Sequence, residues 1–423
     1  MMGSVLSNRV YRHLFFAQVL ALMGTSLATV ALGLLAYDLA GANAGAVLGT
    51  ALAIKMLAYI GVAPVAAAFA ERLPRRALLV ALDVARGGVA LMLPFVTQVW
   101  QVYMLIFVLQ AFSAAFTPTF QATIPDVLPD EKDYTRALSL SRLAYDLENL
   151  ASPAIAALLL TVVSYHQLFA GTVLGFLASA LLIVSVVLPK AAVPPRRSIY
   201  ERITRGLRIV LATPRLQGLL ALNLAVAAGS AMVIVNTVVL VQSDLGLTQT
   251  ATALALAAFG AGSMVVALAL PKLLDHLPER QVMLCGAGLL AAGLLVGSGT
   301  TLSYGLLLPL WFGLGAGYSL AQTPTGRLLR RSAHAVDRPA LFAAQFALSH
   351  ACWLLMYPLA GWLGAAAGLP ASFAVLALLA GAALLLAARL WPSDDPEVLT
   401  HEHAGLAHSH VFVIDEEHPT WPR

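Results

Sequence analysis

Twelve long apolar stretches follow one another along this chain of 423 residues. A helix needs roughly 20 mostly apolar residues to cross a hydrocarbon core of about 30 Å, and each stretch has about that length. We expect transmembrane helices at about residues 14–37, 45–70, 77–97, 101–124, 142–163, 167–189, 216–241, 249–273, 281–299, 303–325, 341–366 and 370–391. Ala, Gly and Leu dominate without alternating polar positions, which favours helices over the strands of a β-barrel. The sequence predicts an all-α membrane protein.

The composition limits the function classes further. Hydrophobic residues make up 60% and charged residues 11% of the chain, whereas soluble proteins carry about 25% charged residues. A soluble enzyme, a disordered protein and a nucleic-acid-binding module are therefore excluded. The two cysteines, Cys285 and Cys352, lie in apolar stretches and provide no disulfide framework. No nucleotide-binding loop of the Gly-x-x-x-x-Gly-Lys-Ser/Thr type occurs, so we do not expect ATP-driven pumping.

The basic residues predict the orientation of the chain. With these spans, Lys55 is the only one of the 25 lysines and arginines that we expect inside the membrane, and the others are expected on one side. Cytoplasmic loops carry an excess of Lys and Arg, which predicts cytoplasmic termini in a bacterial-type inner (plasma) membrane. An even number of spans requires the same arrangement. We expect no cleavable signal peptide, no nucleic-acid partner and a monomer.

Short motifs recur roughly 205 residues apart, each at the same place in its half of the chain. The pairs are Asp38-Leu39 with Asp244-Leu245, Glu71–Arg76 with Asp275–Arg280, and Thr117-Pro118-Thr119 with Thr323-Pro324-Thr325. Six spans per half predict parallel repeats about an axis along the membrane normal. The expected domains are an N-terminal six-helix bundle at 1–189, a cytoplasmic linker at 190–213, a C-terminal bundle at 214–391 and a His-rich cytoplasmic tail at 392–423.

The segment Glu71-Arg72-Leu73-Pro74-Arg75-Arg76 resembles the loop signature of the major facilitator superfamily, with Glu for the usual Asp and Pro for the usual Gly. Residues 152–157, Ser-Pro-Ala-Ile-Ala-Ala, look like a degraded form of the family's antiporter motif. The Arg that many proton-driven drug antiporters carry in span 4 is missing. The resemblance covers about residues 10–391. It implies two six-helix bundles around a central cavity that work by alternating access, with no enzymatic activity and no required cofactor.

Charged residues in the loop signature and its repeat are candidates for a cytoplasmic gate. A carboxylate at a helix end can pair with neighbouring Arg side chains or face the positive end of a helix. Such contacts would hold one state of the transport cycle and break in the other. The candidate gating residues are Glu71, Arg72, Arg75, Arg76, Asp275 and Arg280. The alternative is that these charges only set the topology.

Ionisable residues inside membrane spans are costly and mark functional sites. Asp146 and Glu148 lie about 200° apart on a helix of 3.6 residues per turn, and Arg142 can pair with Asp146 at i,i+4 spacing. One carboxylate would then be tied while the other faces the cavity. Alternatively, both lie in water at the cytoplasmic helix end. Further candidates for proton coupling or substrate binding are Lys55, Asn149, Asn223, Asn236, Gln345, His350 and Cys352, with Gln18 as a weaker one.

Histidines suggest a metal in two places. His350 and Cys352 could join the carboxylates of span 5 in a metal site, although packed helix residues are the commoner case. In the tail, paired His-x-His with carboxylates nearby is a metal-binding composition, and some metal exporters of the superfamily carry similar tails. The five tail histidines are His401, His403, His408, His410 and His418. A solvated tail with incidental histidines is the alternative. Separately, we expect Val411–Ile414 to form a short strand or to dock on the cytoplasmic face.

These features together predict a secondary active transporter. The sequence favours a proton-coupled exporter of small molecules, with Asp146 or Glu148 exchanging the proton. The first alternative is an exporter of nickel, cobalt or zinc with a metal-binding tail. The second is a non-transporting membrane receptor on the same scaffold. Substrate, protons and lipid are the expected partners, and a divalent transition metal at the tail is the possible cofactor.

Overall fold

The structure is a computed structural model that describes residues 2–40, 44–70, 73–160, 162–189, 198–299, 302–395, 398–403, 406–415, 418, 420 and 421. The chain divides into two units, Met1–Ile203 and Thr204–Arg423, called unit 1 and unit 2 below. The boundary falls within the expected linker. The C-terminal tail belongs to unit 2.

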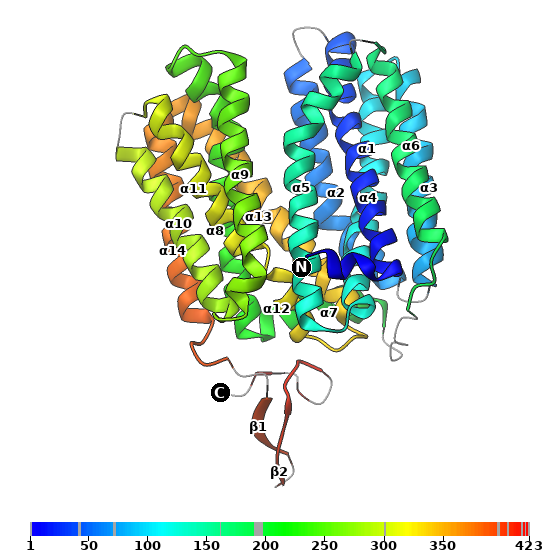
Figure 1. The fold of residues 1–423 in the computed structure, drawn as a ribbon, viewed down its shortest axis with the longest axis vertical. Helices are drawn as coiled ribbons and strands as arrows, with labels where there is room; N and C mark the ends of the chain where they lie inside the picture. The colour runs from blue at the N-terminus through cyan, green and yellow to red at the C-terminus, as the bar shows by residue number, and fades with distance from the viewer. Residues whose placement is uncertain are drawn as a thin grey trace. The chain divides into compact units, whose positions relative to one another are not determined.

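Unit 1 is a helix bundle, coloured blue to green in Figure 1. Its elements are the 3₁₀-helix η1 (Met2–Ser7), α1 (Arg9–Ala40), α2 (Ala44–Ala70), α3 (Arg75–Met92), the 3₁₀ turn η3 (Leu93–Phe95), α4 (Val99–Val127), α5 (Glu131–Leu160) and α6 (Tyr165–Val184). The helix α7 (Ile199–Ala212) contains the boundary between the units.

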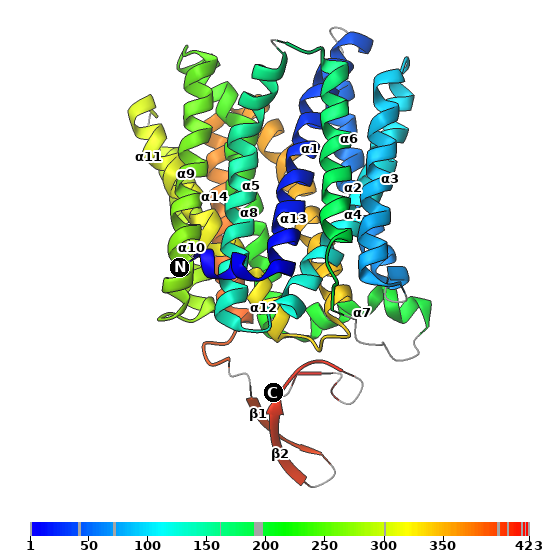
Figure 2. The same ribbon diagram turned by 45° about the vertical axis from the view of Figure 1, so that its right-hand side comes forward.

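Unit 2 repeats the pattern and adds a tail. Its further elements are α8 (Pro214–Val238), the π-helix η4 (Val239–Asp244), α9 (Gln249–Leu274), α10 (Glu279–Gly299), α11 (Tyr304–Gln322), α12 (Thr325–Arg331), α13 (Arg338–Ala367), α14 (Leu369–Leu390), and the antiparallel strands β1 (Val398–His403) and β2 (Leu406–Val411). The two strands form a hairpin, drawn in brown beyond the end of α14 (Figure 2).

Each of the twelve expected spans coincides with a helix or a pair of consecutive helices. Among the described residues, ten helices are long and apolar enough to cross a membrane, and α2 contains a shorter apolar stretch at Ala53–Phe69. The first half of α5 is rich in charged residues, which is unusual for a helix that crosses a membrane. The predicted all-α membrane fold is confirmed.

Local signals in the sequence place several helix ends. Reciprocal hydrogen bonds in capping boxes begin α4 at Gln98 and α6 at Ser164. Pro214 occupies the first turn of α8, where a missing N–H costs nothing. Gly368 separates α13 from α14 with a φ of 84°, a left-handed conformation that favours glycine.

The packing of the helices shows the internal repeat directly. In unit 1, α1 packs on α6 and α5, α3 packs on α6, and α2 packs on α4. In unit 2, α8 packs on α14 and α13, α10 packs on α14, and α9 packs on α11. Each unit-2 pair is the counterpart of a unit-1 pair in chain order. The repeat in the sequence is therefore a repeat of helix contacts.

Small residues allow the closest of these contacts. A Cβ atom added at Gly262 of α9 would lie 2.0 Å from the carbonyl oxygen of Phe312 on α11. At Gly315 of α11 the corresponding distance to the carbonyl oxygen of Phe259 on α9 is 1.8 Å. Membrane helices gain their association energy from such backbone approach, so neither glycine can be replaced without separating α9 from α11.

Candidate functional site

Unit 1 contains a carboxylate and an ammonium group that interact from different helices. Glu148 of α5 hydrogen-bonds the hydroxyl group of Ser26 on α1 and interacts electrostatically with Lys55 on α2. Glu148 and Lys55 are both half-buried. The Lys55 Nζ lies 5.6 Å from the ring centroid of Tyr59, one turn further along α2. Three helices thus bring together groups that are widely separated in the sequence.

The second carboxylate of α5 is held by its own helix. Arg142 Nε donates to Asp146 Oδ1 at 2.9 Å, and Arg142 Nη2 donates to the same oxygen. Asp146 is 3% exposed, so this ion pair is shielded from solvent. Arg142 and Asp146, which are spaced i,i+4, thus form the ion pair that the sequence suggested. Asp146 and Glu148 therefore have different surroundings. The side chain of Asn149 lies outside the described residues.

Neutral polar side chains surround the Glu148 group. The Tyr59 hydroxyl donates to Gln110 Oε1 on α4 at 2.8 Å. The Ser141 hydroxyl on α5 donates to Gln18 Oε1 on α1 at 3.0 Å. Gln18 also hydrogen-bonds the Tyr145 hydroxyl, and Tyr145 interacts electrostatically with Glu148. The polar network therefore joins α1, α2, α4 and α5.

A buried ion pair in α3 is the main feature that the sequence analysis missed. Arg86 Nη2 donates to Asp83 Oδ1, and the Ser179 hydroxyl of α6 donates to Asp83 Oδ2 at 2.7 Å. The Arg86 guanidinium carbon lies 4.0 Å from the ring centroid of Phe116 and 4.5 Å from that of Phe176. The guanidinium group of Arg86 thus forms an ion pair with Asp83 and cation–π contacts with two aromatic rings. This arrangement of Arg86 with Phe116 and Phe176 is called the sandwich below.

This pair corrects an expectation from the sequence. Lys55 is not the only basic residue inside a predicted span, because Arg86 lies in the middle of 77–97 and is 4% exposed. The signal was visible in the sequence as an acidic and a basic residue at i,i+3 spacing within an apolar run. Ion pairs of this spacing are common on helices, so the pattern alone does not distinguish a buried pair from a solvated one.

At the end of unit 1 where α3 begins, two arginines of the loop signature contact neighbouring helices. Arg75 Nη1 donates to Asp126 Oδ2 near the end of α4. Arg76 Nη2 donates to the carbonyl oxygen of Val184 at the end of α6. Glu71 and Arg72, which were also expected to gate, lie outside the described residues.

Unit 2 makes the equivalent contacts, but in one ion pair the acidic and the basic residue have exchanged helices. At the start of α10, Glu279 accepts from Arg327 Nε at 3.1 Å and lies 3.7 Å from Arg331 Nη2, both on α12. Arg280 donates to the carbonyl oxygens of Trp391 and Ala388 at 2.8 and 3.0 Å. Arg280 thus repeats the role of Arg76. Glu279 with Arg331 repeats Arg75 with Asp126, acid and base exchanged.

Asp275, the expected gating carboxylate of unit 2, is exposed at the C-cap of α9. We expect Glu279→Gln to slow transport several-fold more than Asp275→Asn, because Glu279 is the carboxylate that accepts from the α12 arginines. Initial rates of substrate uptake into proteoliposomes measure the difference. Equal rates in the two variants would contradict a role for the Glu279 ion pairs in the cycle.

Three amide side chains expected in the cavity are buried in unit 2. Asn236 Nδ2 of α8 donates to the carbonyl oxygen of Ala360 on α13 at 3.1 Å, which joins the two helices. Among the described residues, Asn223 Nδ2 on α8 and Gln345 Nε2 on α13 are buried donors without a hydrogen-bond partner. A buried unsatisfied donor costs about 1–3 kcal/mol, so both amides are candidates to bind a polar group of the substrate.

His350 and Cys352 both lie on α13 of unit 2. His350 Nδ1 is 2.7 Å from the carbonyl oxygen of Phe346 on its own helix, and its ring contacts Phe346 and Trp353. Cys352 is buried. Where side chains are described, no three His, Cys, Asp or Glu residues gather as a metal site.

The tail is anchored to unit 2 on both sides of the hairpin. Before β1, Asp395 accepts from Arg215 Nη1 at 2.8 Å and from Trp391 Nε1 at 2.9 Å. After β2, Phe412, Val413 and Ile414 are all buried. His418 is buried too and shares a hydrogen bond of 2.9 Å between its Nδ1 and Asp415 Oδ1. The side chains of the other four tail histidines lie outside the described residues.

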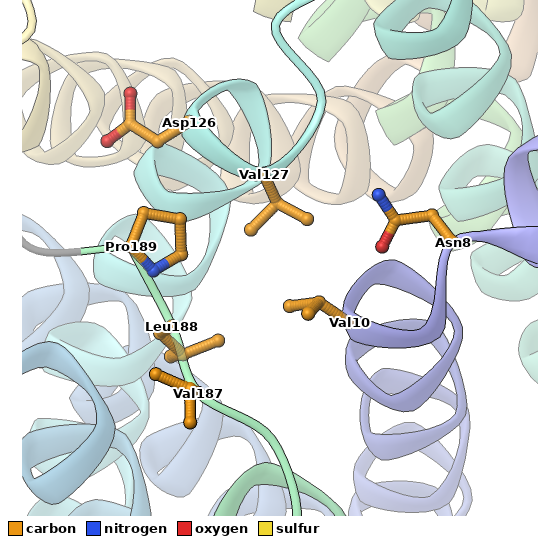
Figure 3. A pocket seen from close by; sticks show the side chains of 7 residues that line it. All are labelled: Asn8, Val10, Asp126, Val127, Val187, Leu188 and Pro189. Atoms are coloured by element: carbon orange, nitrogen blue, oxygen red, sulfur yellow. The ribbon is translucent and has the colours of Figure 1, made fainter.

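A pocket of about 290 Å³ opens in unit 1 beside the Arg75 contact. It is lined by Asn8, Val10, Asp126, Val127, Val187, Leu188 and Pro189. Figure 3 shows the side chains of Val10, Val127 and Leu188 around the opening, with Asn8 across from Asp126. Neither Glu148 nor Lys55 lines it, so this pocket is separate from the central polar group.

Comparison with known proteins gives relatives in one family. Residues 14–233 and 219–415 match the Major Facilitator Superfamily. Macrolide efflux protein A of Streptococcus pyogenes is 27% identical over 153 residues, which cover 34% of this chain and 38% of that protein. The chain thus spans well under half the length of this relative. The uncharacterized MFS-type transporter YvqJ of Bacillus subtilis is 23% identical over 421 residues, covering 94% of this chain and 97% of that protein.

Solved structures agree on the fold. The human organic anion transporter MFSD10 (TETRAN) has a TM-score of 0.74 at 15% identity, covering 90% of this chain and 99% of that one. At this identity the likeness shows the fold alone. The family match covers both units, and the packing repeat described above is present in each of them. The chain therefore belongs to the Major Facilitator Superfamily of secondary transporters.

Proposed function

We propose that this transporter exports small amphipathic organic molecules in exchange for protons, and that Glu148 binds the proton. The observation that supports the proposal is the hydrogen bond of Glu148 with Ser26 and its electrostatic interaction with Lys55, groups that come from three helices of unit 1. Ionisable residues inside membrane segments mark proton relays and substrate pathways. When a half-buried carboxylate takes up a proton, it loses its negative charge and with it the attraction to a nearby ammonium group.

The geometry favours Glu148 over Asp146 for this role. Asp146 is tied by Arg142, so a proton would have to displace a guanidinium group that donates to it through two nitrogens. Glu148 hydrogen-bonds a neutral hydroxyl group and interacts only electrostatically with Lys55 and Arg142, so no guanidinium hydrogen bond has to be displaced. Protonation of Glu148 would remove its attraction to Lys55 and free α2 and α5 to move relative to each other.

The substrate class is inferred from the chemistry of the helices and from the relatives. The described helices offer mainly Ala, Leu and other apolar side chains, with the neutral donors of Asn223 and Gln345 in unit 2. The similarity to macrolide efflux protein A makes a macrolide the first compound to test. We further propose that the protein acts as a monomer with both termini in the cytoplasm. Export of a divalent metal is the weaker alternative.

The test uses purified protein in proteoliposomes with an imposed pH gradient. We expect a labelled macrolide to accumulate when the interior is acidic, and we expect an ionophore that collapses the gradient to abolish accumulation. Ni²⁺ and Co²⁺, measured in parallel, should not accumulate. Accumulation that ignores the pH gradient would overturn proton coupling, and accumulation of the metals alone would support the alternative.

The two unpartnered amides give a separate prediction about substrate binding. Asn223→Ala and Gln345→Ala are each expected to raise the KM for the transported compound several-fold, because each removes a donor that the substrate would satisfy. The dependence of uptake on the pH gradient should stay unchanged. Asn236→Ala is the control, since its amide already bonds Ala360: it is expected to lower thermal stability and leave KM unaltered. An unchanged KM in both test variants would contradict their contact with substrate.

A further inference from the structure

We propose that the C-terminal tail regulates the transport cycle, because its Asp395 holds Arg331 away from Glu279 at the start of α10. When the tail leaves its docked position, Arg331 is free to close on Glu279, and transport slows. This inference rests on the transport function proposed above and adds a means of regulating it. All of these residues belong to unit 2.

One nitrogen atom of Arg331 faces both carboxylates. Arg331 Nη2 donates to Asp395 Oδ2 at 2.5 Å and lies 3.7 Å from Glu279 Oε2. Hydrogen bonds between a guanidinium group and a carboxylate have N···O distances of about 2.7–2.9 Å. The contact with the tail is therefore a close ion pair, whereas the contact with Glu279 is too long for a hydrogen bond. Asp395 and Glu279 compete for the same guanidinium group, and the docked tail has the shorter contact.

Arg331 has a donor left with which to approach Glu279. Its Nε is buried and, in the part of the chain that the structure describes, has no hydrogen-bond partner. The other oxygen of Glu279, Oε1, accepts from Arg327 at 3.1 Å. Without Asp395, Glu279 is the carboxylate that attracts Arg331, and this attraction grows as the two groups approach each other. Two arginines of α12 would then hold the start of α10.

The two carboxylates belong to one row of charged groups that alternate in sign. The row runs through Arg215, Asp395, Arg331, Glu279 and Arg327. It joins α8 to the tail, the tail to α12, and α12 to α10. Because each charge is shared between neighbours, removing one member changes the pairing of the others. The position of the tail is thereby linked to the contact between α10 and α12.

The place of Asp395 depends on the rest of the docked tail. Arg215 Nη1 donates to Asp395 Oδ1 at 2.8 Å, and Arg215 Nη2 donates to the carbonyl oxygen of Phe412 at 3.4 Å. The guanidinium carbon of Arg215 also lies 4.8 Å from the ring centroid of Trp421. One arginine of α8 thus holds the tail both before β1 and after β2. Release of the segment after β2 removes two of the contacts that fix this arginine beside Asp395.

A tighter contact between α10 and α12 slows the cycle for a simple reason. Alternating access moves helices between two arrangements, and an ion pair made in only one of them has to break in every cycle. Sharing Arg331 with Asp395 keeps the Glu279–Arg331 contact weak enough to break. Glu279→Gln removes the arrangement that this contact stabilises, whereas release of the tail traps it. The docked tail is therefore the state that permits fast transport.

The first test compares Asp395→Asn with Asp394→Asn in the full chain, reconstituted in proteoliposomes. Both variants remove one negative charge from adjacent positions, but Asp394 is exposed and Asp395 makes the ion pairs. We expect Asp395→Asn to slow uptake of the labelled compound several-fold per folded molecule, while Asp394→Asn keeps the native rate. Equal rates in the two variants would overturn the proposal.

Combining Asp395→Asn with Glu279→Gln shows whether the tail acts through Arg331. Asp395→Asn should slow the Glu279→Gln variant no further, because no carboxylate remains on which Arg331 can close. In detergent, Glu279→Gln should lower the melting temperature more in the Asp395→Asn background than in the native chain, because the ion pair it removes is then stronger. Equal shifts in the two backgrounds would overturn the proposal. This measurement needs no substrate, so it separates failure of the regulation from failure of the proposed transport.

Phe412→Ser tests the role of docking without leaving a buried arginine unpaired. Phe412 is 3% exposed, and its loss should release the segment after β2. We expect faster hydrogen exchange at 406–415 and uptake slowed as in Asp395→Asn. Val398→Ser, at a position of β1 that is 52% exposed, is the matched control and should change neither property. Native uptake by Phe412→Ser with a freely exchanging tail would contradict regulation by docking.

Discussion

Glu148→Gln is expected to abolish transport driven by a pH gradient while leaving exchange of substrate across the membrane measurable. Glutamine keeps the size of the side chain and a hydrogen bond to Ser26, but it cannot take up or release a proton. Without the negative charge, Lys55 loses its electrostatic partner on α5. Uptake of labelled substrate with and without an acidic interior, compared with counterflow at equal pH, measures the two properties separately.

Glu148→Asp and Asp146→Asn are the matched controls for this prediction. Aspartate at position 148 keeps a titratable group, so some pH-driven uptake should return. Asparagine at position 146 breaks the ion pair with Arg142 and is expected to lower stability while the dependence on pH remains. If Glu148→Gln keeps full pH-driven uptake, the proton is carried by another group, and Lys55 and His350 are the next to test.

Arg86→Met is expected to cost about 3–5 kcal/mol of stability, because it leaves a buried carboxylate without its counter-charge. Asp83 is fully buried, so water cannot compensate for the missing guanidinium group. We expect little folded protein on size-exclusion chromatography in detergent, or a strongly lowered melting temperature. Lys55→Met is the control at a half-buried position, and it should fold with much less loss.

The double variant Asp83→Asn with Arg86→Met distinguishes a missing charge from a missing side chain. Removing both charges eliminates the unpaired carboxylate, and replacing a buried pair by neutral groups is often nearly neutral in stability. The double variant should therefore recover most of the folded protein that the single variant loses. If it is as unstable as Arg86→Met, the stabilisation comes from the contacts of Arg86 with Phe116 and Phe176 and not from the ion pair.

The helices of this protein could be predicted from the sequence because a membrane span needs a long apolar run, which is a local property. The Arg142–Asp146 pair followed from helical spacing for the same reason. The Glu148 contacts could not be predicted, since Ser26 and Lys55 lie on helices far away in the chain. The position of Arg86 within a span was readable, but its sandwich between Phe116 and Phe176 depends on how α3, α4 and α6 pack.

The repeat could also be predicted only in part, because its position is visible in the sequence but its ion pairs depend on how the helices pack. The sequence singled out Asp275 because it stands where Glu71 stands in the first half, yet Glu279 makes the ion pairs. In the equivalent contact, the two halves exchange the acidic and the basic residue. In the tail, four of the five histidines lie on the strands β1 and β2, and His418 follows them along the chain.

The sandwich around Arg86 also constrains how the ribosome and the translocon can build unit 1. Each of Asp83 and Arg86 costs roughly 2.5–3.5 kcal/mol at the centre of a lone inserted helix. Phe176 and Ser179, which stabilise the pair, lie on α6 and leave the ribosome roughly 90 residues after it. A nascent chain that ends before α6 therefore carries an ion pair in α3 that lacks its contacts with Phe176 and Ser179. We expect α3 to reach its full stability in the membrane only after α6 has been synthesised.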